Sequence, residues 1–313
     1  MTIEQYIAAS IDLGSNSFRL LVAACSSGTM KVLEKKLVTV RLGQGLGRNN
    51  RLHQHAMERG LDVLHSFRKV LDMHRVQNIR TCGTEALRRA ANSQAFLRAA
   101  EKILQCEIEI ISGMEEASLS LVGALSGGVD LSGPILLADV GGGSTELIHS
   151  STLTGPPKVA TIGIGAVNLA EKFLVEPLYE ITAMDMLLAD KIGPTLKEMN
   201  IPGDYQRFEL IGSGGTATSL AALDLNLATY EESLVHGHIL HAHSMEQLWR
   251  KLIALPAPER NRLPCLGESR GEILPAGLRI YQTLLKLLQH DRIRISDTGL
   301  LEGILLSTIP SSH

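Results

Sequence analysis

The sequence predicts an α/β protein built from two related domains. Three observations lead to this prediction: a motif that occurs twice, an order of strands and helices that repeats around it, and a length of 313 residues, which suits two domains. The chain is 44% hydrophobic, so each domain can bury a core of its own. We place the domains at residues 1–125 and 126–313.

The repeated motif reads Asp, aliphatic, Gly, two small residues, Ser, two variable residues, Leu. It starts at Asp12 and again at Asp139, an offset of 139 − 12 = 127 residues. In each copy an apolar run precedes the acid and another follows the turn, the pattern of two strands joined by a tight glycine turn. Such a turn lets backbone N–H groups approach phosphate oxygens, while the carboxylate can hold a bridging cation. Two facing copies would form a phosphate-binding cleft between the domains.

The first half begins with three apolar runs and continues with alternating helices and strands. Apolar residues recur at three- and four-residue steps between residues 52 and 74, which predicts a helix: Met57, Leu61, Leu64, Phe67 and Leu71. The predicted elements, in order, are strands at 6–11, 18–25 and 30–41, this helix, a strand at 79–82, helical sequence to residue 104, a strand at 108–111 and a helix that ends near residue 125.

The second half repeats this order. Its predicted elements are strands at 135–139, 146–150 and 157–164, helices at 166–173 and 181–198, a strand at 208–211, a helix from the turn at 212–216 to residue 223, a strand at 293–295 and a closing helix after the turn at 296–299. Three prolines, at 256, 258 and 264, predict a loop before Arg270, and Trp249 and Leu252 are expected in the core. The repeated order predicts two mixed sheets flanked by helices.

Four glycine-rich turns, at 14–16, 141–144, 212–216 and 296–299, open onto helices or strands. A helix N-terminus presents unpaired N–H groups and the positive end of the helix dipole, so each turn is a candidate phosphate site. One such turn is weak evidence because turns need glycine whatever they bind. Four of them, with acids beside them, favour a phosphate-binding protein. The dinucleotide-binding and P-loop glycine patterns are absent from the sequence.

The acids attached to these turns are Asp12, Asp139 and Glu146. Carboxylates of this kind suit a Mg²⁺ ion that keeps several waters and bridges to substrate oxygens. A capping role in the turn is the alternative for the two aspartates, and a solvated strand position is the alternative for Glu146. Arg19 holds the place of Glu146 in the first copy, which suggests that one copy offers charge to the metal and the other to phosphate.

A candidate general base lies at the start of the helix that ends near residue 125. Ser112 and Glu115 fit a capping box, in which the glutamate reaches back to the N-cap backbone. Glu116 lies about 100° further round the helix and is left to act as a base, although an acid in a first helical turn is also favoured by the dipole alone. Arg88 and Arg89 follow another turn; either could grip phosphate or be solvated.

Composition excludes several classes. A net charge of −3 argues against a nucleic-acid binder. The four cysteines are widely spaced, so we expect reduced thiols and no zinc site. With no signal sequence and no apolar run long enough to span a bilayer, a soluble cytoplasmic protein without membrane contact is expected. His236, His238, His241 and His243 lack the spacing of a helical zinc site and are interpreted as exposed histidines between two elements.

Together these motifs resemble the exopolyphosphatase and guanosine pentaphosphate phosphohydrolase (Ppx/GppA) family. The resemblance covers nearly the whole chain, from Asp12-Leu13-Gly14-Ser15-Asn16-Ser17 to the segment Ser296–Gly303. It implies two duplicated ribonuclease H-like domains of the actin, sugar kinase and chaperone ATPase superfamily, with the active site in the cleft between them. The family's catalytic glutamate falls on Glu116. The family also suggests a homodimer.

The resemblance and the motifs lead to one functional hypothesis: a Mg²⁺-dependent exopolyphosphatase that releases the terminal phosphate of inorganic polyphosphate. The catalytic candidates are Glu116, Glu115 and Arg88, and the metal candidates are Asp12, Asp139 and Glu146. The phosphate-binding candidates are Gly14, Ser15, Asn16, Arg19, Thr84, Gly141, Gly142, Gly143, Ser144, Gly214, Gly215 and Thr216. Longer family members carry a further HD-type domain associated with gripping long chains, so we expect limited processivity without it. Glu85, where a small or neutral residue is expected, is a second departure from the family.

Three alternatives stay open at the level of sequence. Guanosine pentaphosphate presents the same terminal phosphoanhydride and would be cleaved by the same residues. A non-hydrolysing module that binds an alarmone or ATP would use the same turns without turnover. A sugar kinase is possible on fold alone, because fold does not fix function.

Overall fold

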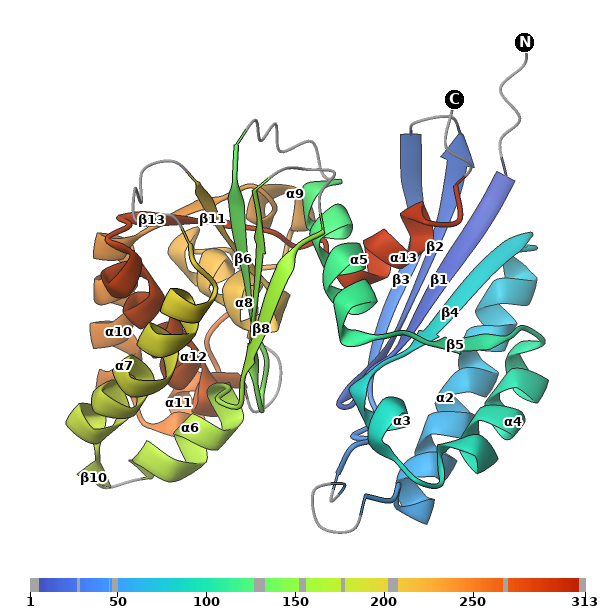
Figure 1. The fold of residues 1–313 in the computed structure, drawn as a ribbon, viewed down its shortest axis with the longest axis horizontal. Coiled ribbons are helices and arrows are strands. Elements are labelled where there is room, and N and C mark those ends of the chain that lie inside the picture. The colour runs from blue at the N-terminus through green and yellow to red at the C-terminus, as the bar shows by residue number, and fades with distance from the viewer. Residues whose placement is uncertain are drawn as a thin grey trace. The chain divides into compact units, whose positions relative to one another are not determined.

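The computed structural model describes residues 6–26, 29–44, 46, 50–126, 133–151, 156–175, 178–201, 208–266 and 270–309. The chain divides into two compact units. The N-terminal unit comprises Met1–Ser126 and Gly299–His313, and the C-terminal unit comprises Gly127–Thr298. Each unit is a β-sheet with helices packed on it (Figure 1). The predicted α/β class with two sheets is confirmed.

The N-terminal unit is built on a five-stranded mixed sheet in the order β3-β2-β1-β4-β5. Its strands are β1 (Tyr6–Leu13), β2 (Ser17–Ser26), β3 (Thr29–Thr39), β4 (Asn78–Gly83) and β5 (Ile108–Ile110). The first three form an antiparallel meander, and β4 and β5 run parallel to β1. This is the predicted order of three adjacent strands followed by helix and strand in alternation.

Helices cover both faces of this sheet (Figure 1). They are α2 (Gln54–Met73), α3 (Glu85–Arg89), α4 (Ser93–Leu104), α5 (Gly113–Leu125) and α13 (Leu300–Leu306). Ala9 and Ile11 of β1 pack into the core formed with α2 and α4, whereas Ala8 packs against Leu301 of α13. Because side chains alternate along a strand, Asp12 lies on the same face as Ala8.

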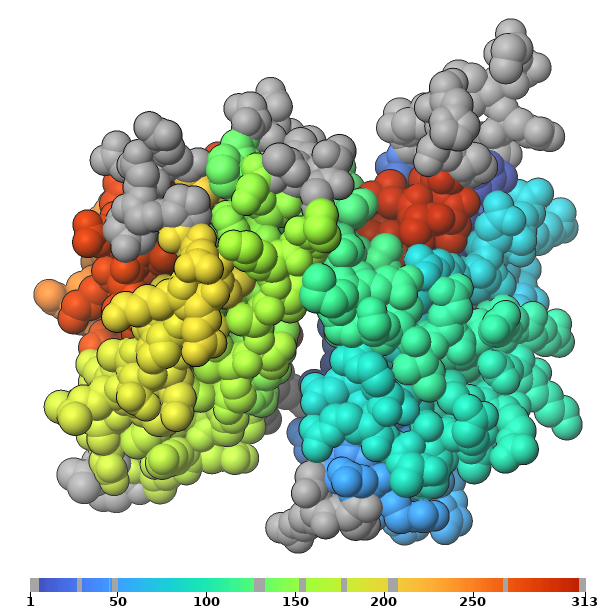
Figure 2. Space-filling model, in the orientation of Figure 1, coloured from blue at the N-terminus to red at the C-terminus, as the bar shows by residue number. Residues whose placement is uncertain are grey.

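The end of the chain completes the N-terminal unit. Helix α13 buries Leu301 and Leu305 on β1 and β2, and Figure 2 shows residues of α13, in red, among blue and green residues of that unit. Gly303 lies so close to the backbone of Leu119 in α5 that a Cβ at Gly303 would overlap it. The predicted domain span of 126–313 therefore differs from the observed division, because the closing helix finds its apolar surface on the first sheet.

The C-terminal unit is built on a six-stranded sheet in the order β12-β13-β11-β6-β7-β8. Its strands are β6 (Ile135–Val140), β7 (Thr145–Ser150), β8 (Lys158–Ile162), β11 (Glu209–Ser213), β12 (Ile239–His241) and β13 (Arg292–Ile295). β6, β7 and β8 form an antiparallel meander, and β11 and β13 continue parallel to β6. Apart from the edge strand β12, this repeats the N-terminal sheet, so the predicted duplication is confirmed.

The helices of this unit form one large core with the sheet. They are α6 (Ala166–Phe173), α7 (Ile181–Glu198), α8 (Gly214–Asp224), α9 (Glu232–Val235), α10 (Ala242–Ala254), α11 (Ala257–Arg260) and α12 (Arg270–Leu288), with a two-stranded ribbon of β9 (Leu174–Val175) and β10 (Leu178–Tyr179). The predicted helices at 166–173 and 181–198 coincide with α6 and α7. Trp249 and Leu252 are buried as expected, and α11 lies within the predicted proline loop.

The main element that sequence reasoning missed is α12. Its buried residues recur at helical spacing, at Leu274, Leu278, Tyr281 and Leu285. Pro275 lies inside the helix, where proline removes one backbone donor. The consequence is functional, because α12 carries two of the side chains that hold the glycine turns of this unit.

Candidate active site

The first glycine turn joins β1 to β2 in the N-terminal unit. The amide of Gly14 donates to the carbonyl of Ser17 at 3.1 Å, and a Cβ on Gly14 would lie 2.8 Å from that same oxygen. Glycine is therefore required by the close approach. The carbonyl of Ser15 accepts from Gly43 at 2.8 Å. Because N–H and C=O of a trans peptide point in opposite directions, the amide of Asn16 points away from residue 43.

Asp12 and Arg19 face each other at the mouth of this turn, in register across β1 and β2. Oδ2 of Asp12 accepts a hydrogen bond of 2.7 Å from Nε of Arg19 and forms an ion pair with Nη2 of Arg19 at the same distance of 2.7 Å. Asp12 is 2% exposed, and among the described residues no atom serves as a hydrogen-bond partner for its Oδ1. A buried carboxylate oxygen without a donor favours a bound cation or water. The two residues, predicted to serve metal and phosphate separately, thus form one ion pair.

Glu116 lies in the first turn of α5 and pairs with Arg88 of α3. Nη1 of Arg88 donates to Oε2 of Glu116 at 3.1 Å and to the carbonyl of Ile111 at 2.7 Å. Burial raises the pKa of the Glu116 carboxyl, and the hydrogen bond from Arg88 opposes that rise. A carboxylate with a raised pKa is a stronger base. The structure thus brings together Glu116 and Arg88 of the predicted set.

Glu115 points elsewhere. Its amide donates to Oγ of Ser112 at 3.1 Å, which is one half of the predicted capping box. Its carboxylate does not return to the N-cap backbone as predicted; it accepts instead from Nη2 of Arg80 at 2.7 Å. The carboxylate of Glu115 pairs with Arg80 because a charge-assisted hydrogen bond is stronger than a hydrogen bond from a neutral backbone amide. Glu115 and Glu116 are therefore held by different arginines.

Thr84 and Glu85 start helix α3. Thr84 is buried, and its amide lies 3.4 Å from the carbonyl of Leu13, which places it beside the first glycine turn. Glu85 pairs with Arg89 at 2.9 Å, and both side chains are about half exposed. Arg89 is thus the solvated arginine of the predicted pair, and Arg88 is the one that faces the candidate base.

The second glycine turn joins β6 to β7 in the C-terminal unit and has the same backbone hydrogen bond as the first. The amide of Gly141 donates to the carbonyl of Ser144 at 3.0 Å. Backbone amides at the start of helix α6 donate hydrogen bonds to carbonyls of this turn. The amide of Ala166 donates to the carbonyl of Gly141 at 2.9 Å, and the amide of Val167 donates to the carbonyl of Gly142 at 2.8 Å. Peptide geometry then directs the amides of Gly142 and Gly143 away from α6.

Amides held in this way form a concavity that suits an anion. The side-chain amide of Asn168 extends the same arrangement by donating to the carbonyl of Gly143 at 3.0 Å, which directs the amide of Ser144 away from α6 as well. The predicted phosphate-binding role of residues 141–144 stays a prediction, and this geometry is what supports it.

Asp139 and Glu146 lie directly opposite each other on β6 and β7. Like charges in this position repel unless a cation or donor lies nearby. Oγ of Ser144 donates to Oε1 of Glu146 at 2.5 Å. The corresponding pair in the N-terminal unit is Asp12 and Arg19. The residue opposite the aspartate is therefore basic in the N-terminal unit and acidic in the C-terminal unit. The acidic pair suits a metal ion, whereas in the mixed pair only Oδ1 of Asp12 is left for one.

The third glycine turn starts α8. Gly214 has φ +79°, a conformation that favours glycine, and a Cβ there would overlap Oδ1 of Asp139. Oγ1 of Thr216 donates to the carbonyl of Val140 at 2.9 Å, which ties α8 to the end of β6. The hydroxyl of Tyr281 on α12 lies 3.1 Å from the carbonyl of Ser213 and is fully buried. These contacts fix Gly214, Gly215 and Thr216 against the strand that carries Asp139.

Arg270, at the start of α12, is a site residue that sequence reasoning missed. Its Nη1 donates to the carbonyl of Gly215 at 2.6 Å and to Oγ of Ser219 at 2.9 Å. A Cβ on Gly215 would lie 2.5 Å from that nitrogen, so glycine makes room for the guanidinium. Burial lowers the pKa of Arg270. A desolvated cation at a turn suited to phosphate is stabilised by a bound anion. Sequence reasoning would have identified Arg270 if it had predicted a helix that starts at residue 270.

The histidine segment was predicted to be exposed, and this is correct only for His243. His238 is partly buried and lies 2.8 Å from Oδ2 of Asp224. His241 and His243 stack with ring centroids 5.5 Å apart. Within the part of the chain that the structure describes, no group of three or more His, Cys, Asp or Glu could hold a metal ion. The predicted Mg²⁺ site stays a prediction.

Comparisons with known proteins give a consistent picture. The model of the Ppx/GppA phosphatase family matches residues 21–312. The chain is 28% identical to exopolyphosphatase 2 of Mycobacterium tuberculosis over 96% of this chain and 97% of that protein. It is 31% identical to the guanosine-5'-triphosphate,3'-diphosphate pyrophosphatase of Vibrio parahaemolyticus over 96% of this chain and 59% of that protein. The crystal structure of the Aquifex aeolicus member of the Ppx/GppA family superposes with a TM-score of 0.85, at 28% identity and 97% coverage of both chains.

Proposed function

Because the chain belongs to the Ppx/GppA phosphatase family, a group of hydrolases that act on phosphoric anhydrides, we propose that it is an exopolyphosphatase. It releases the terminal phosphate of inorganic polyphosphate by attack of water. The observation that carries this proposal is the pair of Glu116 and Arg88, in which burial raises the pKa of the carboxyl at the start of α5.

Glu116 is the general base of this proposal. Its carboxylate orients a water molecule and accepts its proton as the oxygen attacks the terminal phosphorus. The raised pKa brings the base closer to neutral pH, where proton transfer is more favourable. Arg88 holds the carboxylate in place and offers its remaining N–H groups to substrate oxygens.

The glycine turns supply the rest of the electrostatic stabilisation. The amides of Gly142 and Gly143 are aligned by the docking of α6 on their carbonyls, and Arg270 adds a buried positive charge at Gly215. Dipoles and charges that are positioned before the reaction stabilise the phosphoryl group without having to reorganise. Arg19 completes this set in the N-terminal unit.

Mg²⁺ is part of the proposal, and carboxylates in each of the two units support it. Asp139 and Glu146 form an acidic pair across two strands, and Oδ1 of the buried Asp12 needs a partner. Carboxylate oxygens are the ligands that Mg²⁺ prefers, bound directly or through water. When bound, the ion would neutralise charge on the phosphate oxygens.

The test is release of inorganic phosphate from long-chain polyphosphate with Mg²⁺. Glu116→Gln keeps the shape of the side chain and removes the base, so we expect turnover to fall by about 10²- to 10⁴-fold while polyphosphate still binds. Glu58→Gln changes the same residue type on the exposed surface of α2 and is the matched control. Unchanged turnover of the Glu116 variant would remove this residue from the mechanism.

Guanosine pentaphosphate is the second candidate substrate, because a relative at 31% identity is named for cleavage of this type of nucleotide. A parallel reaction with the nucleotide decides between the two. Phosphate release from the nucleotide alone would overturn the polyphosphate assignment and leave the chemistry unchanged.

Two further parts of the proposal concern the cellular compartment and the oligomeric state of the protein. The four cysteines are free thiols, two of them buried, as expected in a reducing compartment such as the cytoplasm. Among the described residues no helix is both long and apolar enough to cross a membrane. The homodimer suggested by the family can be tested by light scattering.

A further inference from the structure

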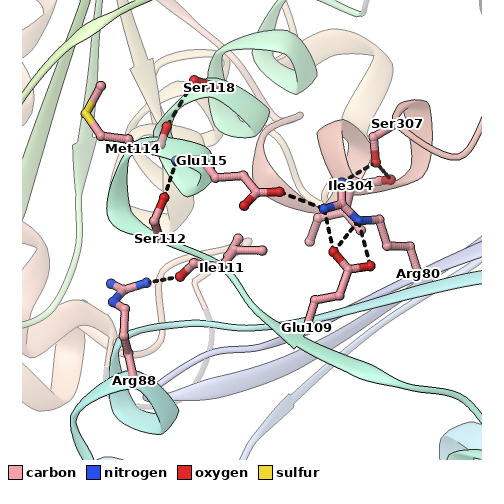
Figure 3. Close-up of polar contacts among 10 residues, drawn as sticks. All are labelled: Arg80, Arg88, Glu109, Ile111, Ser112, Met114, Glu115, Ser118, Ile304 and Ser307. Atoms are coloured by element: carbon pink, nitrogen blue, oxygen red, sulfur yellow. Dashed lines mark hydrogen bonds and ion pairs between the residues drawn. The ribbon is translucent and has the colours of Figure 1, made fainter.

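A cluster of polar side chains lies beside the candidate base but is not used in the mechanism above. We name it the Arg80 cluster: Arg80 of β4, Glu109 of β5, Glu115 of α5 and Ser307 after α13 (Figure 3). Nη2 of Arg80 donates to Glu109 and to Glu115, each at 2.7 Å, and Nη1 donates to Oγ of Ser307 at 2.7 Å. One guanidinium therefore joins two strands, the start of α5 and the end of α13.

The geometry of the guanidinium matches its acceptors. Nε of Arg80 also lies 3.2 Å from both oxygens of Glu109, so that pair is bidentate. Oγ of Ser307 donates to the carbonyl of Ile304 at 2.6 Å, which leaves a lone pair for Arg80. The hydrogen bonds that Arg80 donates to Glu109 and Glu115 raise the pKa of Arg80, so the side chain stays charged. A planar fork with several fixed acceptors specifies a position more tightly than a single ion pair does.

The cluster acts on the turn of helix that carries the base. Glu115 and Glu116 are consecutive residues, and each is held by a different arginine. Arg88 holds Glu116 and the carbonyl of Ile111, and Arg80 holds Glu115. If Arg80 is removed, the start of α5 loses the ion pair of Glu115 and keeps the contacts of Arg88 and the Ser112 cap. Rotation of this turn would move the Glu116 carboxylate away from its position.

Helix α5 is already fixed at its other end. A Cβ at Gly123 would overlap the backbone carbonyl of Gly299, and a Cβ at Gly303 would overlap the carbonyl of Leu119. The C-terminal half of α5 and helix α13 thus pack backbone against backbone. The N-terminal turn lacks such packing, since Met114 is 50% exposed. The orientation of that turn therefore depends on side-chain contacts.

We propose that Arg80 is a positioning residue for Glu116: by holding Glu115 and Ser307 together, it sets the orientation of the first turn of α5. The proposal rests on the proposed function, in which Glu116 is the base. In the proposed mechanism Arg80 itself touches no reacting atom.

The first test compares Arg80→Gln with Arg68→Gln in the phosphate-release assay. Arg68 is a matched control, because it belongs to the same unit, pairs with Asp72 and is 19% exposed, against 18% for Arg80. We expect Arg80→Gln to lower kcat by about 10- to 100-fold with KM nearly unchanged, as misplacement of a catalytic group by about 1 Å does. Arg68→Gln should keep the wild-type kcat. Equal kcat values for the two variants would overturn the proposal.

The second test does not depend on activity. Amide hydrogen exchange of peptides that cover residues 113–118 should speed up in Arg80→Gln and stay at the wild-type rate in Arg68→Gln. A wild-type protein that releases no phosphate would refute the proposed function, while unchanged exchange in Arg80→Gln would refute the positioning role by itself.

A double-mutant cycle identifies the path of the effect. If Arg80 acts through Glu115, then Arg80→Gln combined with Glu115→Gln should lose no more activity than the worse of the two single variants. Arg80→Lys keeps the charge but not the fork and should recover only part of the lost kcat. Additive losses in the double variant would show that Arg80 acts by another route and would overturn the proposal.

Discussion

The turn at the start of α8 allows a sharp test of how the structure holds Asp139. Two glycines of the C-terminal unit have nearly the same positive φ, 79° at Gly214 and 82° at Gly237. A Cβ at Gly237 meets no atom within 4 Å, whereas a Cβ at Gly214 overlaps Oδ1 of Asp139. Gly214→Ala and Gly237→Ala therefore share the backbone strain and differ in one contact.

The expected magnitudes follow from this difference. An L-residue in the left-handed region costs about 1–2 kcal/mol, and both variants bear this cost. In Gly214→Ala the carboxyl carbon of Asp139 would lie 3.3 Å from the new methyl group, with Oδ1 closer still. Because ordinary contacts are about 3.5–4.0 Å, the carboxylate must shift by roughly 1 Å. A displacement of that size at a reacting centre lowers the rate by about 100-fold.

Urea unfolding and phosphate release measure the two effects separately. Both variants should lose about 1–2 kcal/mol of unfolding free energy, and Gly214→Ala somewhat more. Only Gly214→Ala should lose about 100-fold in kcat. Equal activity of the two variants would refute the reasoning, since it would mean that the position of Asp139 does not matter for the reaction.

Further predictions concern pH, metal and stability. Arg88→Gln removes a bond that lowers the pKa of Glu116, so the acid limb of the pH profile of kcat/KM should move to higher pH. Because burial raises the pKa of Glu116 in the folded state, its ionised form opposes folding; Glu116→Gln should unfold at higher urea than wild type at pH 8 but not at pH 4. Tyr281→Phe removes the buried hydroxyl near the Ser213 carbonyl and should cost about 1–3 kcal/mol in urea unfolding. Chelation of Mg²⁺ should abolish phosphate release, and Asp12→Asn should raise the Mg²⁺ concentration for half-maximal activity; release unaffected by chelation would contradict the metal assignment.

Local signals made much of the fold predictable. The glycine turns beside Asp12 and Asp139 appear in the sequence as a repeat, and the structure gives them the same backbone hydrogen bond. The helix at 181–198 follows from its apolar periodicity. Glu116 could be singled out because the capping pattern gives its neighbour Glu115 a different task.

What could not be predicted depends on contacts between distant segments. No local pattern links Arg80 to Ser307, which are 227 positions apart. The guanidinium of Arg270 reaches Gly215 only because α12 packs beside α8. The ion pair of Asp12 and Arg19 depends on the register of β1 and β2, and a shift by one residue would separate them. Such contacts follow from tertiary packing, and no single segment contains them.

The return of the chain into its first unit has a consequence for synthesis on the ribosome. Residues 127–298 are contiguous, so the C-terminal unit can fold as soon as it has emerged. The N-terminal unit emerges first but lacks the helix that covers Ala8, Leu21 and Ala23 until Leu301 and Leu305 have been made. Its sheet therefore presents an apolar face while the 301 − 126 = 175 residues after Ser126, through Leu301, are translated, and chaperones that bind apolar strands can bind there. Of the two units, the one whose first strands are made earlier is completed later.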